Sequence, residues 1–194
     1  MPASVAGGWT AGQVRAMQDE AHHWPRYELV DGLLLVTNAP RPVHQLVLGE
    51  LHVALHGYVR ANRLGLVLTS PSALELEPNT VVQPDLFVVR AADGHVQRWP
   101  DVTGLLLAVE VLSPSTANAD RTRKRRLYQR AGVADYWVVD ADARLVERWT
   151  PSDLRPEPVE DRLAWHPAGA PEPLLLDLPA LFADACGDAA DPAP

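Results

Sequence analysis

Cysteine and long apolar runs are both scarce in this sequence of 194 residues. Cys186 is the one cysteine, which excludes an intramolecular disulfide and a zinc site built from several cysteines. No apolar run approaches the roughly 20 residues that a membrane helix needs, and the N-terminal segment has no basic stretch followed by an apolar core. We therefore expect a cytoplasmic protein without a membrane partner.

Basic charge is also scarce, which at first argues against a nucleic-acid partner. The formal net charge is −8, but residues 151–194 account for −7 of it, and residues 1–150 have 16 acidic and 15 basic side chains. Six basic residues between positions 121 and 130 form a dense run, which is either a phosphate-binding surface or a solvated helix face. Within that run, we select Arg121, Arg125 and Arg126 as candidate nucleic-acid contacts.

The length fits one ordinary domain, and the sequence has no internal repeat and no glycine-rich phosphate loop. We expect a flexible N-terminus over residues 1–9, a single domain over residues 10–182 and a disordered acidic tail over residues 183–194.

Periodicity and turn signals predict the order of the elements. A helix starts after Thr10, with Gln13 completing a capping box, and the dipeptide at positions 31 and 32, Asp-Gly, suits a type I′ turn between two strands. Further helices are expected over residues 42–62 and 118–130, and further strands over residues 66–69, 73–76, 84–89, 105–112, 135–139 and 145–149. This order predicts a mixed α/β sheet flanked by helices, with an N-terminal β-hairpin. After residue 150 the periodicity fades, although residues 174–176 and 178–182 have apolar side chains that could dock on the core.

Glu110 is the clearest polar residue at a position where the pattern requires an apolar one. It interrupts the run GLLLAVEVL, which otherwise suits a strand covered on both faces. An ionised carboxylate buried without a partner is costly, so another group must compensate its charge. The alternative is a carboxylate at the strand end that faces solvent or pairs with an arginine.

Lys124 is the only lysine in the chain, against sixteen arginines. It shares a helical stripe with Leu127 and Tyr128, so we expect it on the packed face of its helix. Lysine is a compact charge whose pKa shifts readily, whereas arginine stays protonated. The alternative is a structural ion pair with Asp120, four residues earlier on the same stripe.

Three further polar residues are candidates for the same site. Asp85 opens an apolar strand directly after a proline, and the alternative is an ordinary Pro-Asp turn. His44 lies at helical spacing with Leu48 and therefore points inward, where it could also be a core histidine. Glu28 lies on the first strand of the hairpin and is the least distinctive of the set.

The chemistry of these residues suits a divalent cation and a phosphodiester. Carboxylates at the ends of neighbouring strands supply hard oxygen ligands, so we assign Asp85 and Glu110 to Mg²⁺, with Mn²⁺ as a substitute. Lys124 would position the attacking water or offset charge on the phosphate, while His44 would handle a proton and Glu28 would add a carboxylate. The set describes metal-dependent phosphodiester hydrolysis.

Other chemistries fit the sequence less well. Ser113 and Ser115 do not lie in the G-x-S-x-G pattern of a nucleophile elbow, so a serine hydrolase is disfavoured. The histidine pair at positions 22 and 23 and the pair His52 and His56 lack an H-E-x-x-H pattern, and we interpret them as surface histidines.

Six segments of the sequence also occur together in a known family. They are YELVDG, PRPVHQLV, VVQPDLFVV, LLLAVEVLSPST, ADRTRKRRLY and AGVADYWVVD, within residues 27–149. By these segments the chain resembles the Uma-type restriction endonucleases, which belong to the PD-(D/E)XK nuclease superfamily. The resemblance implies a restriction-endonuclease-like mixed sheet flanked by helices.

The resemblance also implies roles for individual residues. Asp85 would be the motif aspartate and Glu110 the second acidic ligand, while His44 and Glu28 match upstream polar positions of the family. The superfamily pattern has a lysine two residues after the glutamate, where this chain has a leucine. The resemblance implies that Lys124, in the following helix, supplies the ammonium instead.

Three functions are compatible with these observations. The leading hypothesis is a Mg²⁺-dependent endonuclease that acts on DNA, and a homodimer is a reasonable expectation for so small a nuclease. The net acidity and the lack of a recognition domain leave open a catalytically inactive binding or assembly module with the same fold. A hydrolase of small phosphoesters is the third possibility.

Overall fold

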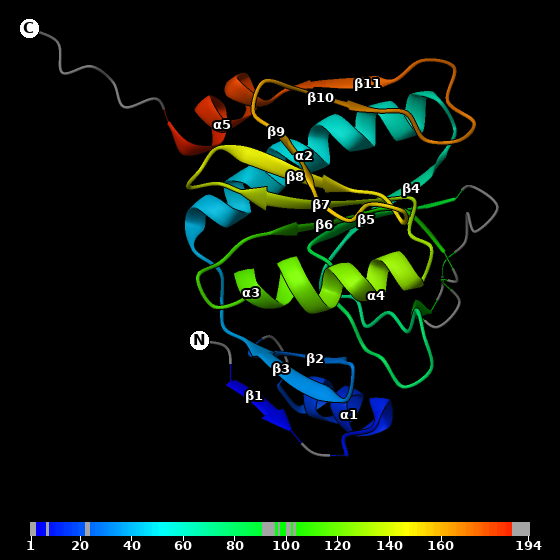
Figure 1. The fold of residues 1–194 in the computed structure, drawn as a ribbon, viewed down its shortest axis with the longest axis vertical. Coiled ribbons are helices and arrows are strands. Elements are labelled where there is room, and N and C mark those ends of the chain that lie inside the picture. Colours follow the sequence, from blue (N-terminus) through cyan, green and yellow to red (C-terminus); the bar gives the residue numbers. More distant parts are fainter. Residues whose placement is uncertain are drawn as a thin grey trace, which may run out of the picture.

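A six-stranded mixed sheet, in the order β4-β5-β6-β7-β8-β9, forms the centre of the fold (Figure 1). The computed structural model describes residues 3–6, 8–21, 24–90, 96, 98–99, 102 and 104–187. The six strands are Gly65–Thr69, Leu86–Arg90, Leu105–Val111, Asp135–Asp140, Leu145–Trp149 and Glu157–Val159. Neighbouring strands are antiparallel except β6 and β7, which run parallel and therefore need the helical crossover that joins them.

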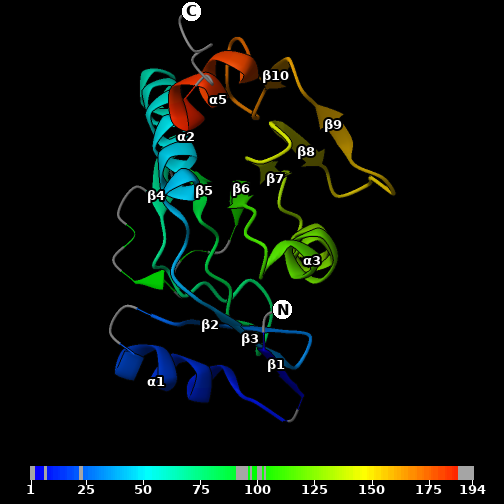
Figure 2. The same cartoon turned by 90° about the vertical axis from the view of Figure 1, so that its left-hand side faces the viewer.

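Helices cover both faces of this sheet, as the edge-on view shows (Figure 2). On one face lie α2 (Pro42–Ala61) and α5 (Leu178–Cys186). The crossover between β6 and β7 covers the other face, and it consists of α3 (Ala117–Ala119), the π-helical segment η3 (Asp120–Lys124) and α4 (Arg125–Arg130). The protein therefore has the three layers expected of an α/β fold.

Alternation along the central strands divides the apolar core between the two faces of the sheet. Leu107 of β6 and Trp137 of β7 belong to the cluster beneath α2 and α5. Ala108 and Val138, each one residue further along its strand, belong to the cluster beneath the crossover. Because successive side chains of a strand point to opposite faces, a residue at position 110 must also face the crossover.

A smaller layer lies at one end of the molecule (Figure 2). It contains β1 (Ala3–Ala6), β2 (Arg26–Val30) and β3 (Leu33–Thr37) in the order β1-β3-β2, together with α1 (Ala11–Ala21). Leu29 of β2 exchanges two backbone hydrogen bonds, of 2.7 and 2.9 Å, with Val81. This bridge fixes β2 beside the segment that leads into β5.

A second hairpin-like pair extends the core on the α2 side. β10 (Arg162–Trp165) and β11 (Leu174–Asp177) are antiparallel. Leu163 and Trp165 alternate with exposed neighbours and are buried in the cluster beneath α2 and α5. The β10–β11 pair is therefore part of the folded core.

Most predicted elements are present. Thr10 and Gln13 form the expected capping box, because the Thr10 amide donates to Gln13 Oε1 (2.9 Å) and the Gln13 amide donates to Thr10 Oγ1 (3.3 Å). Asp31 (φ 50°) and Gly32 (φ 74°) both have the positive φ of a type I′ turn between β2 and β3. The predicted α/β class, with a mixed sheet flanked by helices and an N-terminal hairpin, is confirmed.

One expected strand is not formed, and the structure describes parts of the two terminal segments. Residues 73–76 are not a strand, because the chain turns back at Thr80, whose amide donates to the Glu77 carbonyl, and only a single bridge between Leu74 and Val82 can form. Within residues 1–9, for which a flexible segment is expected, residues 3–6 form β1, which pairs with the edge of β3. Of the acidic tail expected over residues 183–194, residues 183–186 belong to α5, and residues 188–194 lie outside the described part of the chain.

No helix in the described part of the chain is long and apolar enough to span a membrane.

Candidate active site

Asp85 and Glu110 lie next to each other where β5 and β6 pair. Leu86 faces Val109 in the strand register, so one further step along β5 brings Asp85 beside Glu110. Strand alternation places both carboxylates on the face that the crossover covers. Both are buried, with 5% and 3% of their surface exposed.

Lys124 reaches the same face from the end of η3 and contacts carboxylates of three different elements. Its Nζ lies 2.8 Å from Glu28 Oε2 and 3.1 Å from Glu110 Oε1. Asp120 Oδ1 lies 3.3 Å from the same nitrogen. Burial alone would lower the pKa of Lys124, but Glu110, Glu28 and Asp120 together raise this pKa well above its ordinary value. The side chain is therefore a buried ammonium at neutral pH.

Asp85 accepts hydrogen bonds on both carboxylate oxygens. Arg26 Nη1 donates to Oδ1 (3.1 Å), while His44 Nε2 and the Val111 amide each donate to Oδ2 (3.0 Å). Burial would raise the pKa of Asp85, but the hydrogen bond from His44 and the charges of Arg26 and Lys124 outweigh burial and lower the pKa to about 2. Asp85 is therefore an ionised carboxylate at neutral pH.

The pKa of Glu110 is shifted in the opposite direction. Its Oε1 accepts hydrogen bonds from Lys124 Nζ (3.1 Å) and from the Tyr128 hydroxyl (3.0 Å). Burial raises its pKa well above the ordinary value, and Lys124 offsets this only in part because neighbouring carboxylates raise it further. A cation brought next to Glu110 would favour its ionised form.

A cavity of about 20 Å³ lies between these groups. Its lining residues are Arg26, Glu28, Thr37, Asn38, Pro40, His44, Asp85, Glu110, Val111, Ser113, Thr116 and Lys124. A volume of this size holds about one water molecule or one small ion. The cavity can therefore hold one metal ion or one water molecule, but it is too small for a nucleotide.

The formal charges around the cavity do not balance. With every group counted in its charged form, four buried carboxylates (Glu28, Asp85, Glu110 and Asp120) face two buried cations (Arg26 and Lys124), a formal excess of two negative charges, which the raised pKa values of Glu110 and Asp120 reflect. Such an excess is costly in a low-dielectric interior, and a divalent cation would neutralise it.

The hydrogen bonding of the cluster is also incomplete. His44 Nδ1 is buried without a hydrogen-bond partner, and Asp120 Oδ1 has the ion-pair contact with Lys124 (3.3 Å) but no hydrogen bond. The carboxylates of Asp85 and Glu110 are hard donors on one cavity, so they fit Mg²⁺ or Mn²⁺. In the described residues, however, no group of three or more His, Cys, Asp or Glu is arranged to hold a metal by itself, because Lys124 occupies the position among three of the carboxylates.

Comparison with known proteins identifies the family of this chain. A family model named Uma2 and described as "putative restriction endonuclease" matches residues 13–179. The chain belongs to the Uma2 family. The resemblance drawn from the sequence segments is thereby confirmed.

A solved structure supports the fold of this Uma2 protein. It is described as "a putative nuclease belonging to DUF820 from Anabaena variabilis", and it matches with a TM-score of 0.65 at 22% sequence identity, covering 83% of this chain and 92% of that chain. At this identity the likeness shows the fold alone. No curated protein matches the chain.

In the present structure, one cavity is lined by all five residues selected from the sequence (Glu28, His44, Asp85, Glu110 and Lys124). Sequence reasoning missed Arg26, although Arg26 and Glu28 are two residues apart on one strand and must share a face. It also treated the pairing of Lys124 with Asp120 as an alternative to a role in the site. The structure contains both, because Lys124 contacts Asp120 as well as Glu110.

The arginine run of this Uma2 protein divides into engaged and exposed side chains. Arg121 pairs with Glu147 (2.7 Å) and with Asp140 (3.0 Å). The Arg125 guanidinium lies over the Trp149 ring, 4.7 Å from its centroid. Arg126, the third of the selected arginines, is exposed.

The other residues weighed in the sequence have local roles. His52 and His56 stack on α2 with ring centroids 5.6 Å apart, and the histidines at positions 22 and 23 lie outside the described residues. Ser113 Oγ lies 3.0 Å from the hydroxyls of both Ser115 and Thr116. These contacts are those of a hydroxyl-rich turn beside the cavity rather than of an activated nucleophile.

Proposed function

We propose that this Uma2 protein is a metal-dependent endonuclease that hydrolyses phosphodiester bonds of DNA, with Mg²⁺ as the metal and Mn²⁺ as a substitute. The observation that supports the proposal is the formal excess of two negative charges at a cavity with room for one ion. A buried cluster of this charge is poorly compensated by the protein alone and well compensated by a divalent cation.

Asp85 and Glu110 would hold the metal. When bound, the ion would act as a Lewis acid toward a phosphate oxygen and would lower the pKa of a bound water. His44, Arg26 and the Val111 amide fix the orientation of Asp85 through the hydrogen bonds described above. Tyr128 fixes Glu110 in the same way. Both carboxylates therefore have little freedom to turn away from the cavity.

Lys124 would offset the negative charge that develops on the phosphate. Its ammonium lines the cavity and is held by carboxylates of β2, β6 and η3, so no reorganisation is needed when a substrate arrives. Glu28 Oε2 contacts Lys124, and Glu28 Oε1 accepts a hydrogen bond from the main-chain amide of Gln83 (2.8 Å). Glu28 is therefore assigned to positioning the ammonium.

The test compares cleavage and metal binding in the same proteins. Wild type, Glu110→Gln and Lys124→Met are incubated with supercoiled plasmid and with single-stranded DNA in Mg²⁺ or Mn²⁺, and the melting temperature of each is measured with and without Mn²⁺. We expect wild type to nick DNA and to be stabilised by Mn²⁺, and Glu110→Gln to lose both properties. A folded wild type that neither cleaves DNA nor responds to Mn²⁺ would contradict the proposal and indicate a binding module that retains the fold.

A further inference from the structure

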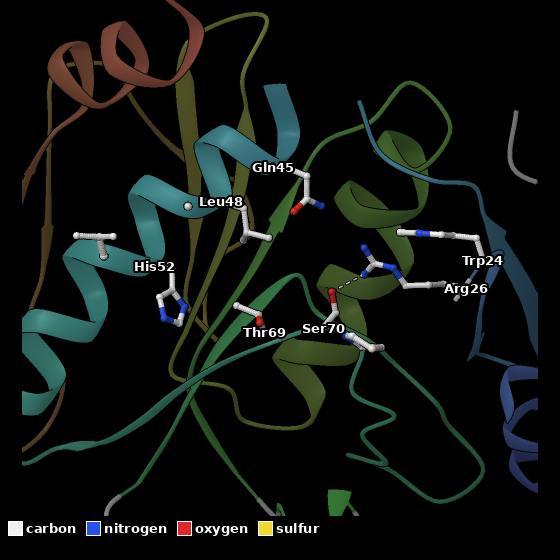
Figure 3. Close-up of a pocket in the computed structure, with 10 residues that line it drawn as sticks. Trp24, Arg26, Gln45, Leu48, His52, Thr69 and Ser70 are labelled. Carbon is white, nitrogen blue, oxygen red and sulfur yellow. Dashed lines mark hydrogen bonds between the residues drawn. The ribbon is translucent and has the colours of Figure 1, made fainter. Parts of the chain in front are cut away.

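A second and much larger hollow lies beside the catalytic cavity. It is an open groove of about 610 Å³, a volume typical of small-molecule sites (~300–1,000 Å³). Its lining residues are Trp24, Arg26, Gln45, Leu48, Gly49, His52, Val53, Thr69, Ser70 and Pro71. Figure 3 shows Gln45, Leu48 and His52 on α2 on one side of the groove, and Thr69 and Ser70 at the end of β4 on the other. The function proposed above does not use this groove.

The groove and the catalytic cavity share a wall. Arg26 lines both, and its guanidinium donates to Asp85 Oδ1 (3.1 Å) on one side and to Ser70 Oγ (2.8 Å) on the other (Figure 3). The Ser70 amide also donates to the main-chain carbonyl of Asp85 (3.2 Å). On α2, His44 faces the catalytic cavity while its neighbour Gln45 faces the groove. A molecule in the groove would therefore lie directly beside the catalytic aspartate.

The charge of the groove suits an anion. Among the described residues that line it, Arg26 is the one with a formal charge, and its ion-pair partner Asp85 lines the neighbouring cavity and not the groove. A guanidinium presents a planar fork of donors that matches phosphate geometry. Because the hydrogen bonds to Asp85 and Ser70 both come from Nη1 of Arg26, a phosphate at the mouth of the catalytic cavity would bind the other nitrogens of this guanidinium.

The remaining lining residues suit a nucleobase. Trp24 supplies an aromatic ring, with the Arg26 guanidinium 4.7 Å above its centroid, and unpaired bases stack on such aromatic and guanidinium planes. Gln45 and His52 offer hydrogen-bonding groups for a base edge. Leu48 provides an apolar floor.

We infer that this groove holds an unpaired nucleotide of the DNA substrate adjacent to the scissile phosphate. The inference rests on the proposed nuclease function and adds a substrate preference to it. A base in a duplex is paired and stacked, and its extrusion costs least where the strand is already single. The catalytic cavity is too small for a nucleotide, so the substrate needs this adjoining space.

Two glycines of α2 give a matched pair of variants. A Cβ added at Gly49 or at Gly57 meets no atom within 4 Å, and both positions are exposed on the same helix. Gly49 lines the groove, whereas Gly57 does not. Gly49→Phe should fill the groove, while Gly57→Phe adds the same side chain elsewhere. Both changes replace a poor helix former with a better one, so both variants should fold.

The experiment measures binding of fluorescein-labelled single-stranded octathymidylate by anisotropy in EDTA, so that cleavage does not interfere. We expect Gly49→Phe to bind about tenfold more weakly than wild type, the order of effect seen when one stacked base is lost. Gly57→Phe should bind as wild type, and Gln45→Ala should give a smaller loss without filling the groove. Far-ultraviolet circular dichroism and melting temperature verify the fold of each variant.

Two outcomes would overturn the inference. Unchanged affinity of Gly49→Phe would show that the groove does not hold the strand. An equal loss with a blunt duplex would show that it contacts backbone rather than an unpaired nucleotide. Failure of the nuclease proposal is a separate result, because it is read from plasmid nicking and from the Mn²⁺-dependent melting temperature of wild type.

Discussion

Lys124 Nζ lies 3.1 Å from Glu110 Oε1, and both side chains are 3% exposed, although the two residues come from different elements. Glu110 is on β6, and the lysine comes from the crossover that leaves this strand. The crossover folds back over the face of β6 on which Glu110 lies, so an ammonium from the helix reaches the carboxylate. A lysine in the crossover can therefore occupy the same place in the site as a lysine two residues after the glutamate on the strand itself.

The first prediction concerns the stability that Lys124 provides. Lys124→Met keeps a side chain of similar length but removes its charge. Three buried carboxylates are then left without their shared ammonium. We expect the free energy of unfolding in EDTA to fall by about 3–5 kcal/mol, as when one partner of a buried ion pair is removed. Urea unfolding measures this. Arg123→Met, an exposed cation one residue earlier, is the matched control and should change little.

A double variant separates the role of the ion pair from packing. Adding Glu110→Gln to Lys124→Met removes one of the uncompensated carboxylates, so part of the lost stability should return. Strictly additive losses in the double variant would show that the two side chains are not coupled.

The second prediction is a loss of stability in acid that depends on Asp85. Its folded pKa of about 2 lies below the ordinary 3.8, so its ionised form stabilises the native state above about pH 4, and this contribution is lost as the pH falls towards 2. The shift corresponds to about 2 kcal/mol. Asp85→Asn should therefore be less stable than wild type at pH 6, with the difference narrowing in acid. Urea unfolding between pH 6 and pH 2.5 tests this, and a difference that stays constant with pH would refute it.

The third prediction has the opposite sign and concerns Glu110. Its folded pKa lies well above the ordinary 4.5, so its contribution to stability is complete below pH 4.5 and is lost as the pH rises through the folded pKa. Without metal, Glu110→Gln should therefore be more stable than wild type at pH 8. In Mn²⁺ the order should reverse, because the wild-type carboxylate gains a cation. Thermal melting in EDTA and in Mn²⁺ decides this, and Glu50→Gln, an exposed carboxylate on α2, should show neither effect.

The site was predictable from the sequence where a charge interrupts an apolar pattern. Glu110 lies inside an apolar strand and Lys124 on an apolar helix stripe, so burial of each could be expected before the structure was known. Arg26 gives no such signal, because an arginine in the first position of a short strand resembles a surface residue. Its burial depends on Asp85, which is 59 residues away in the chain.

The fold was predictable where an element has enough residues to show its period. The 20-residue helix α2 and the buried strand β6 do so. β10 has only 4 residues, and its alternation of buried Leu163 and Trp165 is too short to distinguish from chance. The 4 residues of β1 have no pattern of their own and are ordered by the edge of β3.

The fourth prediction concerns the arginine run and the salt dependence of DNA binding. Arg126 is exposed, so Arg126→Ala should remove about one phosphate contact and lower the slope of log affinity against log salt concentration by about 1. Its melting temperature should be unchanged. Arg121 is held by Glu147 and Asp140, so Arg121→Ala should instead lower the melting temperature and leave the slope closer to that of wild type. Anisotropy titrations at several salt concentrations measure both slopes. Equal slopes for wild type and Arg126→Ala would mean that DNA binds on another face, because a lost phosphate contact must release one counterion fewer.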